Sequence, residues 1–431
     1  MGEKRTRYLI RYVGEFVPET VVRADGSWLE TADGRRVLDF TSGQICVTIG
    51  HNHPRIVQSI WRALGEVAHL NSRMLSPPVL ALAEQLTTLL PAPLEKALLL
   101  STGGEANEAA FRMAKLHTGR FELVGLTRSW HGLNAGTSAL TFAGGHRGYG
   151  PSVPGSHVLP APYAYRCPVR HCHGSCDHTC LEAGFDILDQ HSVGSLCAAV
   201  AEPVLSTGGI IVPPPGYFAR LLELCRERGM LVILDEAQTG FGRLGEMFGL
   251  GLYDIVPDFV AVSKTLGGGL PISALITNAK IELDCYRKGF TQITSHVSDP
   301  LPAAAALAVL QVIEEEDLVR RSRERGAYLM ARLRELQHVH EQIGDVRGVG
   351  LLCGMELVED RDTKRPAGKL AKALSTECLL RGLSIDVARG RPDAASNCFR
   401  IAPPLTVDTE EIDLAVEILD QSLRSVLASK A

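Results

Sequence analysis

Short apolar segments alternate with amphipathic helical segments through the middle of the chain, from Ala97 to about Thr277. This alternation is typical of a parallel β-sheet with crossover helices, because strands covered on both faces become continuous apolar runs. The predicted strands lie at 97–100, 122–126, 198–201, 231–234, 259–262 and 274–277. We therefore expect an α/β fold whose mostly parallel sheet forms a large domain at 61–305.

The two ends of the chain predict a smaller α+β lobe. Asp25-Gly26 marks a hairpin turn in the N-terminal segment, 1–60, where small antiparallel strands are expected. The C-terminal segment of this lobe is 306–431. Its expected elements are two helices and one strand punctuated by glycine, at 320–336, 410–427 and 349–358.

The composition excludes several classes of function. The 44 Lys and Arg residues against 49 Asp and Glu leave a net charge of -5, so no basic surface for nucleic acid is expected. No apolar segment is long and charge-free enough to span a membrane. The charged N-terminus is not followed by a long apolar region, which argues against an ordinary signal peptide. We expect a cytoplasmic enzyme that acts on small molecules.

A lysine stands at the end of one predicted strand. Lys264 follows the strand at 259–262 and precedes Gly267-Gly268-Gly269. Desolvation at such a position lowers the pKa of an ammonium group, and a neutral amine can form an imine with a carbonyl compound. The pattern by itself fits a surface lysine before a glycine turn equally well. The residues that follow the other predicted strands distinguish between these two interpretations.

A glycine turn follows the first strand of the predicted sheet. Gly103 and Gly104 precede a helix with a small apolar face, so N–H groups at the helix start could bind a phosphate. The turn is no Walker motif, because no lysine follows, and its glycine spacing is not that of a dinucleotide fingerprint. A phosphate monoester is the better match, although such a turn often has only a structural role.

Two more residues follow predicted strands. Asp235 ends the strand at 231–234, at the sheet edge where ligands bind in open α/β folds. It could hold a protonated ring nitrogen, or cap a helix. Trp130 could stack on a flat cofactor, or pack in the core. A phosphate turn, an aromatic ring, an aspartate and a lysine together fit pyridoxal 5'-phosphate.

Over nearly its whole length the chain resembles the fold-type I, class III (subgroup II) aminotransferase family of pyridoxal-phosphate enzymes. The wider resemblance rests on Asp-Glu-Ala-Gln at 235–238 and Ser-Lys-Thr-Leu-Gly at 263–267. Gln44 and the stretch His-Val-Ser-Asp-Pro-Leu-Pro at 296–302 resemble the decarboxylase branch, which acts on 2,2-dialkylglycines. The resemblance implies a homodimer, or a dimer of dimers. It also implies release of a ketone and CO2 from an amino acid such as 2-aminoisobutyrate, with the amino group passed to pyruvate or a similar 2-oxo acid.

The same resemblance implies roles for single residues. Lys264 would be the Schiff-base lysine and proton shuttle, Asp235 the partner of the pyridinium nitrogen, and Trp130 the stacking ring. Gln44 would hold the carboxylate that is cleaved. Arg400 would bind a substrate carboxylate that is not cleaved, or that of the amino-group acceptor, as a bidentate fork. The other implied cofactor contacts are Thr102, Gly103, Gly104, Asn107, His131, Glu202, Gln238 and Ser295 of the partner subunit.

Two metal sites are also considered. The decarboxylase branch binds an alkali ion (K+ or Na+), and the matching positions here are Leu70, Ser72, Ser295, Val297 and Asp299, with Leu70 and Val297 offering backbone carbonyls. Separately, the insertion at 166–181 is rich in cysteine and histidine, and its cysteines are Cys167, Cys172, Cys176 and Cys180. Their spacing is longer than that of usual zinc pairs, so zinc binding, redox-sensitive thiols and a reduced surface loop all remain open.

Two other functions fit the same sequence. An ω-amino acid or amine:2-oxo acid aminotransferase would use the same cofactor residues without decarboxylation. A metal-binding or redox-sensing module could instead use the Cys/His-rich insertion on a degenerate enzyme scaffold. The intact set of Lys264, Asp235, Gln238 and Trp130 argues against degeneracy.

Overall fold

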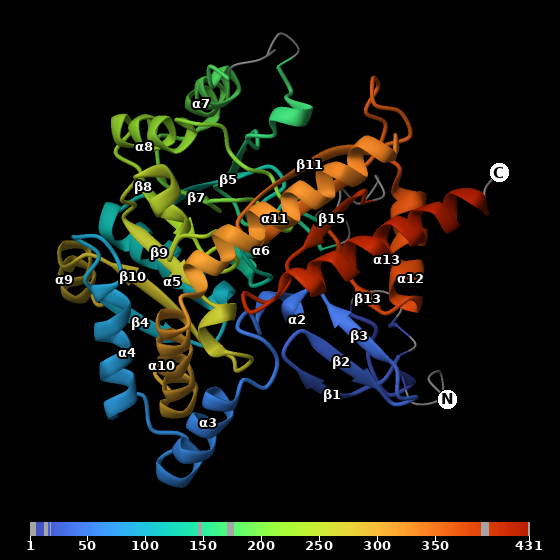
Figure 1. Cartoon of the computed structure of the whole chain (residues 1–431). Coiled ribbons are helices and arrows are strands. Elements are labelled where there is room, and N and C mark those ends of the chain that lie inside the picture. Colours follow the sequence, from blue (N-terminus) through green and yellow to red (C-terminus); the bar gives the residue numbers. More distant parts are fainter. Residues whose placement is uncertain are drawn as a thin grey trace.

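The computed structural model of this 431-residue chain describes residues 6–12, 16–17, 19–144, 149–169, 176–388 and 396–429. Within these ranges the strands form one sheet of seven strands and two of four, with helices packed around them (Figure 1). The α/β fold class predicted from the sequence is confirmed.

The seven-stranded sheet has the strand order β4-β10-β9-β8-β7-β5-β6. Strands β6, β5, β7, β8 and β9 run parallel, whereas β10 is antiparallel to both β9 and β4. The strands are β4 (Lys96–Leu100), β5 (Glu122–Leu126), β6 (Ser156–Leu159), β7 (Leu196–Ala201), β8 (Leu231–Asp235), β9 (Phe259–Val262) and β10 (Ser273–Thr277). All six predicted strands are present, with bounds that differ by at most two residues.

Strand β6 is the member of this sheet that the sequence pattern did not predict. It lies at the edge and pairs only with β5, and Leu159 is its one buried residue. An edge strand has no need of a continuous apolar run, because one side of it faces solvent.

Helices pack against the central sheet. Helix α5 (Gly103–Thr118) packs on β7, β8, β9 and β10 through an alanine-rich face. Other helices described before residue 318 include α3 (Pro54–Glu66), α4 (Pro77–Thr88), α6 (Ala135–Ala139), α7 (Thr179–His191), α8 (Tyr217–Glu227), α9 (Ala279–Arg287) and α10 (Pro300–Glu315), with the short 3-10 turns η1 (Ala164–Arg166) and η2 (Gly249–Tyr253). No helix in the described ranges is long and apolar enough to cross a bilayer.

The N- and C-terminal segments share a four-stranded sheet, β1-β2-β3-β13. Its strands are β1 (Val21–Asp25), β2 (Trp28–Thr31), β3 (Arg36–Asp39) and β13 (Leu383–Ser384). Asp25 pairs with Trp28, so the predicted hairpin turn is present. Figure 1 shows this sheet beside α12 (Gly368–Leu380) and α13 (Thr409–Ala428). The domain boundaries at 61 and 305 remain a prediction.

The third sheet corrects one expectation. In place of one strand at 349–358 there is a hairpin of β11 (Ile343–Val349) and β12 (Leu352–Leu357). Gly350 turns the chain with a φ of 55°, and a Cβ added there would lie 2.6 Å from the carbonyl oxygen of Arg243. The apolar run therefore continues through a tight turn that only glycine fits. The sheet is completed by β15 (Cys398–Ile401) and β14 (Asp386–Val387), and the long helix α11 (Leu318–Val339) packs on β11.

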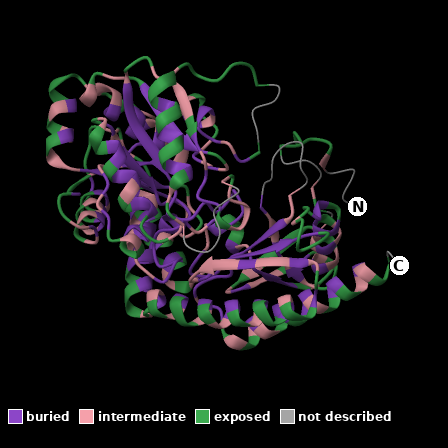
Figure 2. Ribbon diagram, turned by 90° about the horizontal axis from the view of Figure 1, so that it is seen from above, coloured by how far each residue is buried: buried purple, intermediate pink, exposed green. Residues whose placement is uncertain are grey.

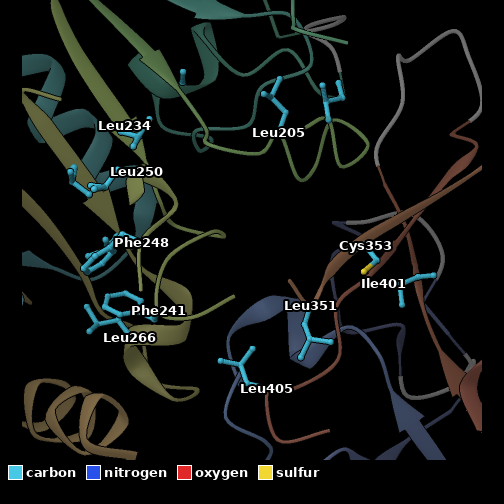
Figure 3. Packing of buried hydrophobic residues seen from close by; sticks show 14 of the residues in the cluster. Leu205, Leu234, Phe241, Phe248, Leu250, Leu266, Leu351, Cys353, Ile401 and Leu405 are labelled. Carbon is cyan, nitrogen blue, oxygen red and sulfur yellow. The ribbon is translucent and has the colours of Figure 1, made fainter. Parts of the chain in front are cut away.

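One cluster of buried apolar residues joins the central sheet to the two smaller sheets. Buried residues gather along the strands and on the inward faces of the helices (Figure 2). Figure 3 shows Phe241, Phe248 and Leu266 beside the central sheet, and Leu351 and Leu405 across from them. The two smaller sheets are therefore held against the ends of the central strands.

Candidate active site

Lys264 lies directly beyond the buried strand β9, where the 3-10 turn η3 (Lys264–Gly267) begins. Its backbone φ is 51°, in the left-handed region that residues other than glycine rarely adopt. Burial lowers the pKa of its ammonium group, although the charge of Asp235 opposes this effect. Lys264 thus has a defined backbone conformation, and burial shifts its side chain toward the neutral amine that imine formation requires.

Asp235 ends β8, the neighbour of β9, and is 3% exposed. Its Oδ2 accepts a hydrogen bond from Asn107 Nδ2 at 2.8 Å and lies 2.8 Å from His131 Nδ1. Its Oδ1 accepts from the backbone N–H of Ala237 at 3.0 Å. Burial alone would raise the pKa of this carboxyl, but the hydrogen bond from His131 leads the effects that lower it below its ordinary value. The carboxylate is therefore held ionised and fixed in direction.

The turn between β4 and α5 has the hydrogen bonding of a helix start that is open to a ligand. The Thr102 side chain accepts from the Glu105 backbone N–H at 3.3 Å, and the Glu105 carboxylate accepts from the Thr102 N–H at 3.0 Å. This capping box leaves the N–H groups of Gly103 and Gly104 without an acceptor inside the helix. A Cβ added to Gly103 would lie 3.3 Å from Ala237 Cβ, so glycine keeps this turn close to the loop after β8.

The segment after β5 lies against the glycine turn. A Cβ added to Gly132, whose φ is 127°, would lie 2.8 Å from Gly104 Cα. Trp130 donates its backbone N–H to Glu202 Oε1 at 2.8 Å. Burial raises the pKa of Glu202 to about 7. The predicted stacking ring is thus anchored by its backbone next to the predicted phosphate turn.

Arg400 lies on β15 and is 8% exposed. Its Nη1 donates to Gln238 Oε1 at 3.0 Å, and its Nη2 pairs with the Asp386 carboxylate on the neighbouring strand β14. Gln238 Nε2 in turn donates to Thr207 Oγ1 at 3.0 Å. The structure therefore brings Arg400 and Gln238 together, and it adds Asp386 as an internal partner that the sequence did not predict.

Gln44 lies in a short left-handed turn, labelled α2 (Ser42–Ile45) in Figure 1. All four residues of the turn have φ between 48° and 65°. Such a conformation costs free energy and persists only where its surroundings fix it. The Asp39 carboxylate does so by accepting the backbone N–H groups of Thr41 and Gly43, each at 2.9 Å.

A buried arginine fixes the same turn from the opposite side. Arg243 is fully buried, and burial lowers the pKa of its guanidinium to about 9. Its hydrogen bonds go to oxygen atoms of Ser42, Thr48, Leu351 and Pro403. Because these residues come from both ends of the chain, Arg243 ties the turn of Gln44 to the segment that follows Arg400.

Cys46, which follows this turn, is near the predicted catalytic lysine. Burial raises the pKa of the Cys46 thiol, and the charges of Lys264 and Arg400 act on it in the opposite direction. The Cys46 side chain therefore lies near both groups.

The predicted alkali-ion ligands lie on two segments that approach each other. His69 Nδ1 lies 2.6 Å from Asp299 Oδ1, and His296 Nδ1 lies 2.5 Å from Asp299 Oδ2. These contacts bring the segment of Leu70 and Ser72 beside the segment of Ser295, Val297 and Asp299. The ligand set itself remains a prediction.

The predicted zinc ligands are described only in part. Cys172 lies outside the described residues. Cys167 and Cys176 are half-buried thiols, and Cys180 is buried in the first turn of α7. Zinc binding by this insertion also remains a prediction.

The sequence reasoning missed four residues that hold the predicted ones in place: Asp39, Thr207, Arg243 and Asp386. Asp39 carried a local signal, because an aspartate two residues before a turn commonly accepts its backbone N–H groups. Asp386 carried none, since its contact with Arg400 depends on the pairing of β14 with β15.

The chain is similar to known proteins over almost its whole length. The family Aminotransferase class-III matches residues 12–423. The uncharacterized aminotransferase C1039.07c of Schizosaccharomyces pombe is 46% identical over 416 residues, which cover 96% of this chain and 92% of that protein. The mitochondrial alanine--glyoxylate aminotransferase 2 of Homo sapiens is 33% identical, with 94% and 82% of the two chains covered. The crystal structure of a Bacillus anthracis aminotransferase superposes with a TM-score of 0.92 at 29% identity, covering 98% of this chain and 97% of that one. The chain belongs to the class III aminotransferase family.

Proposed function

We propose that this class III aminotransferase binds pyridoxal 5'-phosphate at the ends of β4, β8 and β9 and uses it to decarboxylate its amino donor. Asn107 Oδ1 and His131 Nε2 are buried without a hydrogen-bond partner among the described residues, which fits a site built for a polar ligand. The start of α5 would hold the phosphate, Asp235 the ring nitrogen and Lys264 the aldehyde carbon. When bound, the cofactor supplies an electron sink for the bond broken at the amino-bearing carbon.

The protein's own groups would then perform three tasks. Asp235, held by Asn107 and His131, would accept a hydrogen bond from the ring nitrogen and keep that nitrogen protonated. Lys264, whose ammonium pKa is lowered by burial, takes up and returns the proton at the reacting carbon through Nζ. Arg400 orients the carboxylate of the 2-oxo acid.

The amino donor that we propose is a 2,2-dialkylglycine such as 2-aminoisobutyrate. The observation that carries this proposal is the left-handed turn of Gln44, held by Asp39 and Arg243. We infer that a backbone fixed at this cost would hold the Gln44 carboxamide ready to donate to a substrate carboxylate. This contact would orient the bond between the α-carbon and the carboxylate for cleavage, and a substrate without an α-hydrogen can lose only CO2.

The test uses two amines that give the same ketone. With pyruvate, 2-aminoisobutyrate should give acetone, CO2 and alanine, whereas isopropylamine can give acetone and alanine only by losing a proton. The proposal expects one burst of acetone and CO2 per active site from 2-aminoisobutyrate without pyruvate, and steady turnover when pyruvate is added. Acetone from isopropylamine together with no CO2 from 2-aminoisobutyrate would contradict it.

A second candidate is an amine or ω-amino acid:2-oxo acid aminotransferase without decarboxylation. The ion pair of Arg400 with Asp386 favours it, because a neutralised guanidinium lets an uncharged substrate group lie beside it. The Asp386 side chain is 44% exposed, so it has room to turn toward solvent when a substrate carboxylate takes its place. This candidate predicts faster conversion of isopropylamine than of 2-aminoisobutyrate.

We also propose a homodimer in which Ser295 reaches the cofactor phosphate of the other subunit. Ser295 is exposed on the single chain. Large apolar side chains on and after α3 are exposed as well, including Trp61 at 72%, Met74 at 60% and Leu75 at 69%. Large apolar side chains this exposed on neighbouring segments of the chain are typical of a protein interface. An alkali ion on the ligand set of Asp299 would order the same region.

A further inference from the structure

We propose that His69, His296 and Asp299 form a binding site for a divalent late transition-metal ion, with Zn2+ as the best match. One potential ligand atom of each residue lies within 4.8 Å of the others. The two imidazole rings approach with centroids 5.2 Å apart. Two imidazole nitrogens and one carboxylate oxygen are a common zinc ligand set, and they leave a fourth position for water.

The Asp299 carboxylate is available because it does not cap its helix. Asp299 is the N-cap of α10, yet its side chain makes no capping hydrogen bond. The N-caps Asn278 and Asp408 each accept from the N–H of the third helical residue. In α10 that residue is Pro302, which has no N–H to donate. The carboxylate turns instead toward the two histidines.

The low exposure of the Asp299 carboxylate also favours a bound cation. The Asp299 side chain is only 10% exposed. Among the described residues its ion-pair partners are His69 and His296, and no lysine or arginine is close enough to pair with it. A poorly solvated carboxylate beside two imidazole rings offers carboxylate oxygen and ring nitrogen atoms as ligands to a cation. A bound divalent ion would satisfy all three groups.

This site differs in chemistry from the proposed alkali-ion site, although both use Asp299. Alkali ions prefer oxygen ligands, whereas imidazole nitrogen favours zinc and its neighbours in the first transition row. Because His296 follows Ser295, an ion here would also fix the segment that we place at the cofactor of the other subunit. That last consequence rests on the proposed function, whereas binding of the ion does not.

Cobalt binding to the holoenzyme tests the site without relying on activity. The enzyme, freed of metals by a chelator, is titrated with Co2+ while its visible absorption is recorded. We expect one Co2+ per chain with the spectrum of nitrogen and oxygen ligands, displaced by Zn2+. His296→Asn and His69→Gln should each weaken binding by about tenfold or more. His338→Asn is the matched control, because His338 is an exposed histidine on α11, and it should bind as the unchanged enzyme does.

Two outcomes would overturn the proposal. Equal Co2+ affinity in His296→Asn and the unchanged enzyme would exclude His296 as a ligand. An intense cobalt-thiolate absorption as the only signal would place the ion at the cysteine-rich insertion instead. The unfolding temperature of each variant without metal shows whether it is folded, and the two single variants give independent tests if one of them is not.

Discussion

At the scale of single residues, Gln44 is the side chain on which decarboxylation depends in our proposal. Gln44→Ala should lower the rate of CO2 release from 2-aminoisobutyrate by about 100-fold, the usual loss for one well-placed donor. Acetone formation from isopropylamine should change by less than about threefold, since it breaks a C–H bond. Single-turnover assays of both amines measure this, and equal losses would show that Gln44 has only a structural role.

Asp386 is expected to set the balance between charged and uncharged substrates. Asp386→Asn keeps the shape of the side chain but removes its charge, so Arg400 loses its internal ion-pair partner. The KM for pyruvate should fall, because the guanidinium no longer has to release a carboxylate before it binds one. The KM for isopropylamine should rise. A change in kcat alone, with both KM values unchanged, would argue against this role.

The raised pKa of the Glu202 carboxyl predicts an unusual dependence of stability on pH. Burial raises the pKa of its carboxyl from 4.5 to about 7, so ionising it inside the protein costs free energy. Stability should therefore fall as the pH rises from about 4.5 to about 7, by about 3 kcal/mol at most. Glu202→Gln should remove this decline, measured as the unfolding temperature of the holoenzyme between pH 5 and pH 8. Parallel profiles for the two proteins would contradict it.

At the scale of elements, Glu122 joins β5 to the turn that follows α7. Its carboxylate accepts from Ser192 Oγ at 2.6 Å and from the Ser195 N–H at 2.8 Å, and it lies 2.8 Å from His157 Nε2. Burial alone would raise the pKa, but these hydrogen bonds lower it from 4.5 to about 2. The contribution to stability is therefore complete above pH 4.5 and is lost as the pH falls toward 2.

Glu122→Gln tests this attachment of the turn to β5. At pH 7 the variant should unfold at a lower temperature than the unchanged enzyme, because it lacks the charge-assisted hydrogen bonds, with a cost of about 3 kcal/mol or less. The difference should shrink below pH 4.5, where the unchanged carboxyl takes up a proton. A difference that stays constant from pH 7 to pH 3 would contradict the assignment.

At the scale of the whole molecule, the apolar side chains near α3 predict association of two chains. Light scattering should give twice the chain mass of 46.6 kDa. Trp61→Glu should shift the protein toward monomer and lower its cofactor affinity, because a charge would be buried in the interface. Leu380→Glu on α12 is the matched control, since Leu380 is 60% exposed and is not one of these side chains. A monomeric unchanged enzyme with full activity would exclude the dimer.

Much of the fold followed from patterns within short stretches of the chain. The buried strands β8 and β9 are continuous apolar runs, so their ends at Asp235 and Lys264 could be located directly. The edge strand β6 lacks such a run and was missed. The sequence pattern predicts a single strand where the β11–β12 hairpin lies, because hydrophobicity does not reveal the backbone conformation of Gly350.

The sequence by itself determined which residues stand at the strand ends and helix starts, because these positions depend on neighbours a few residues away. Only the tertiary structure decided what those residues touch. Arg400 meets Gln238 across 162 positions of the chain and Asp386 across 14, and Arg243 reaches the turn of Gln44 across 201 from Ser42. Such contacts depend on which strands pair and on how the sheets and loops pack together, and no periodic pattern along the chain records either.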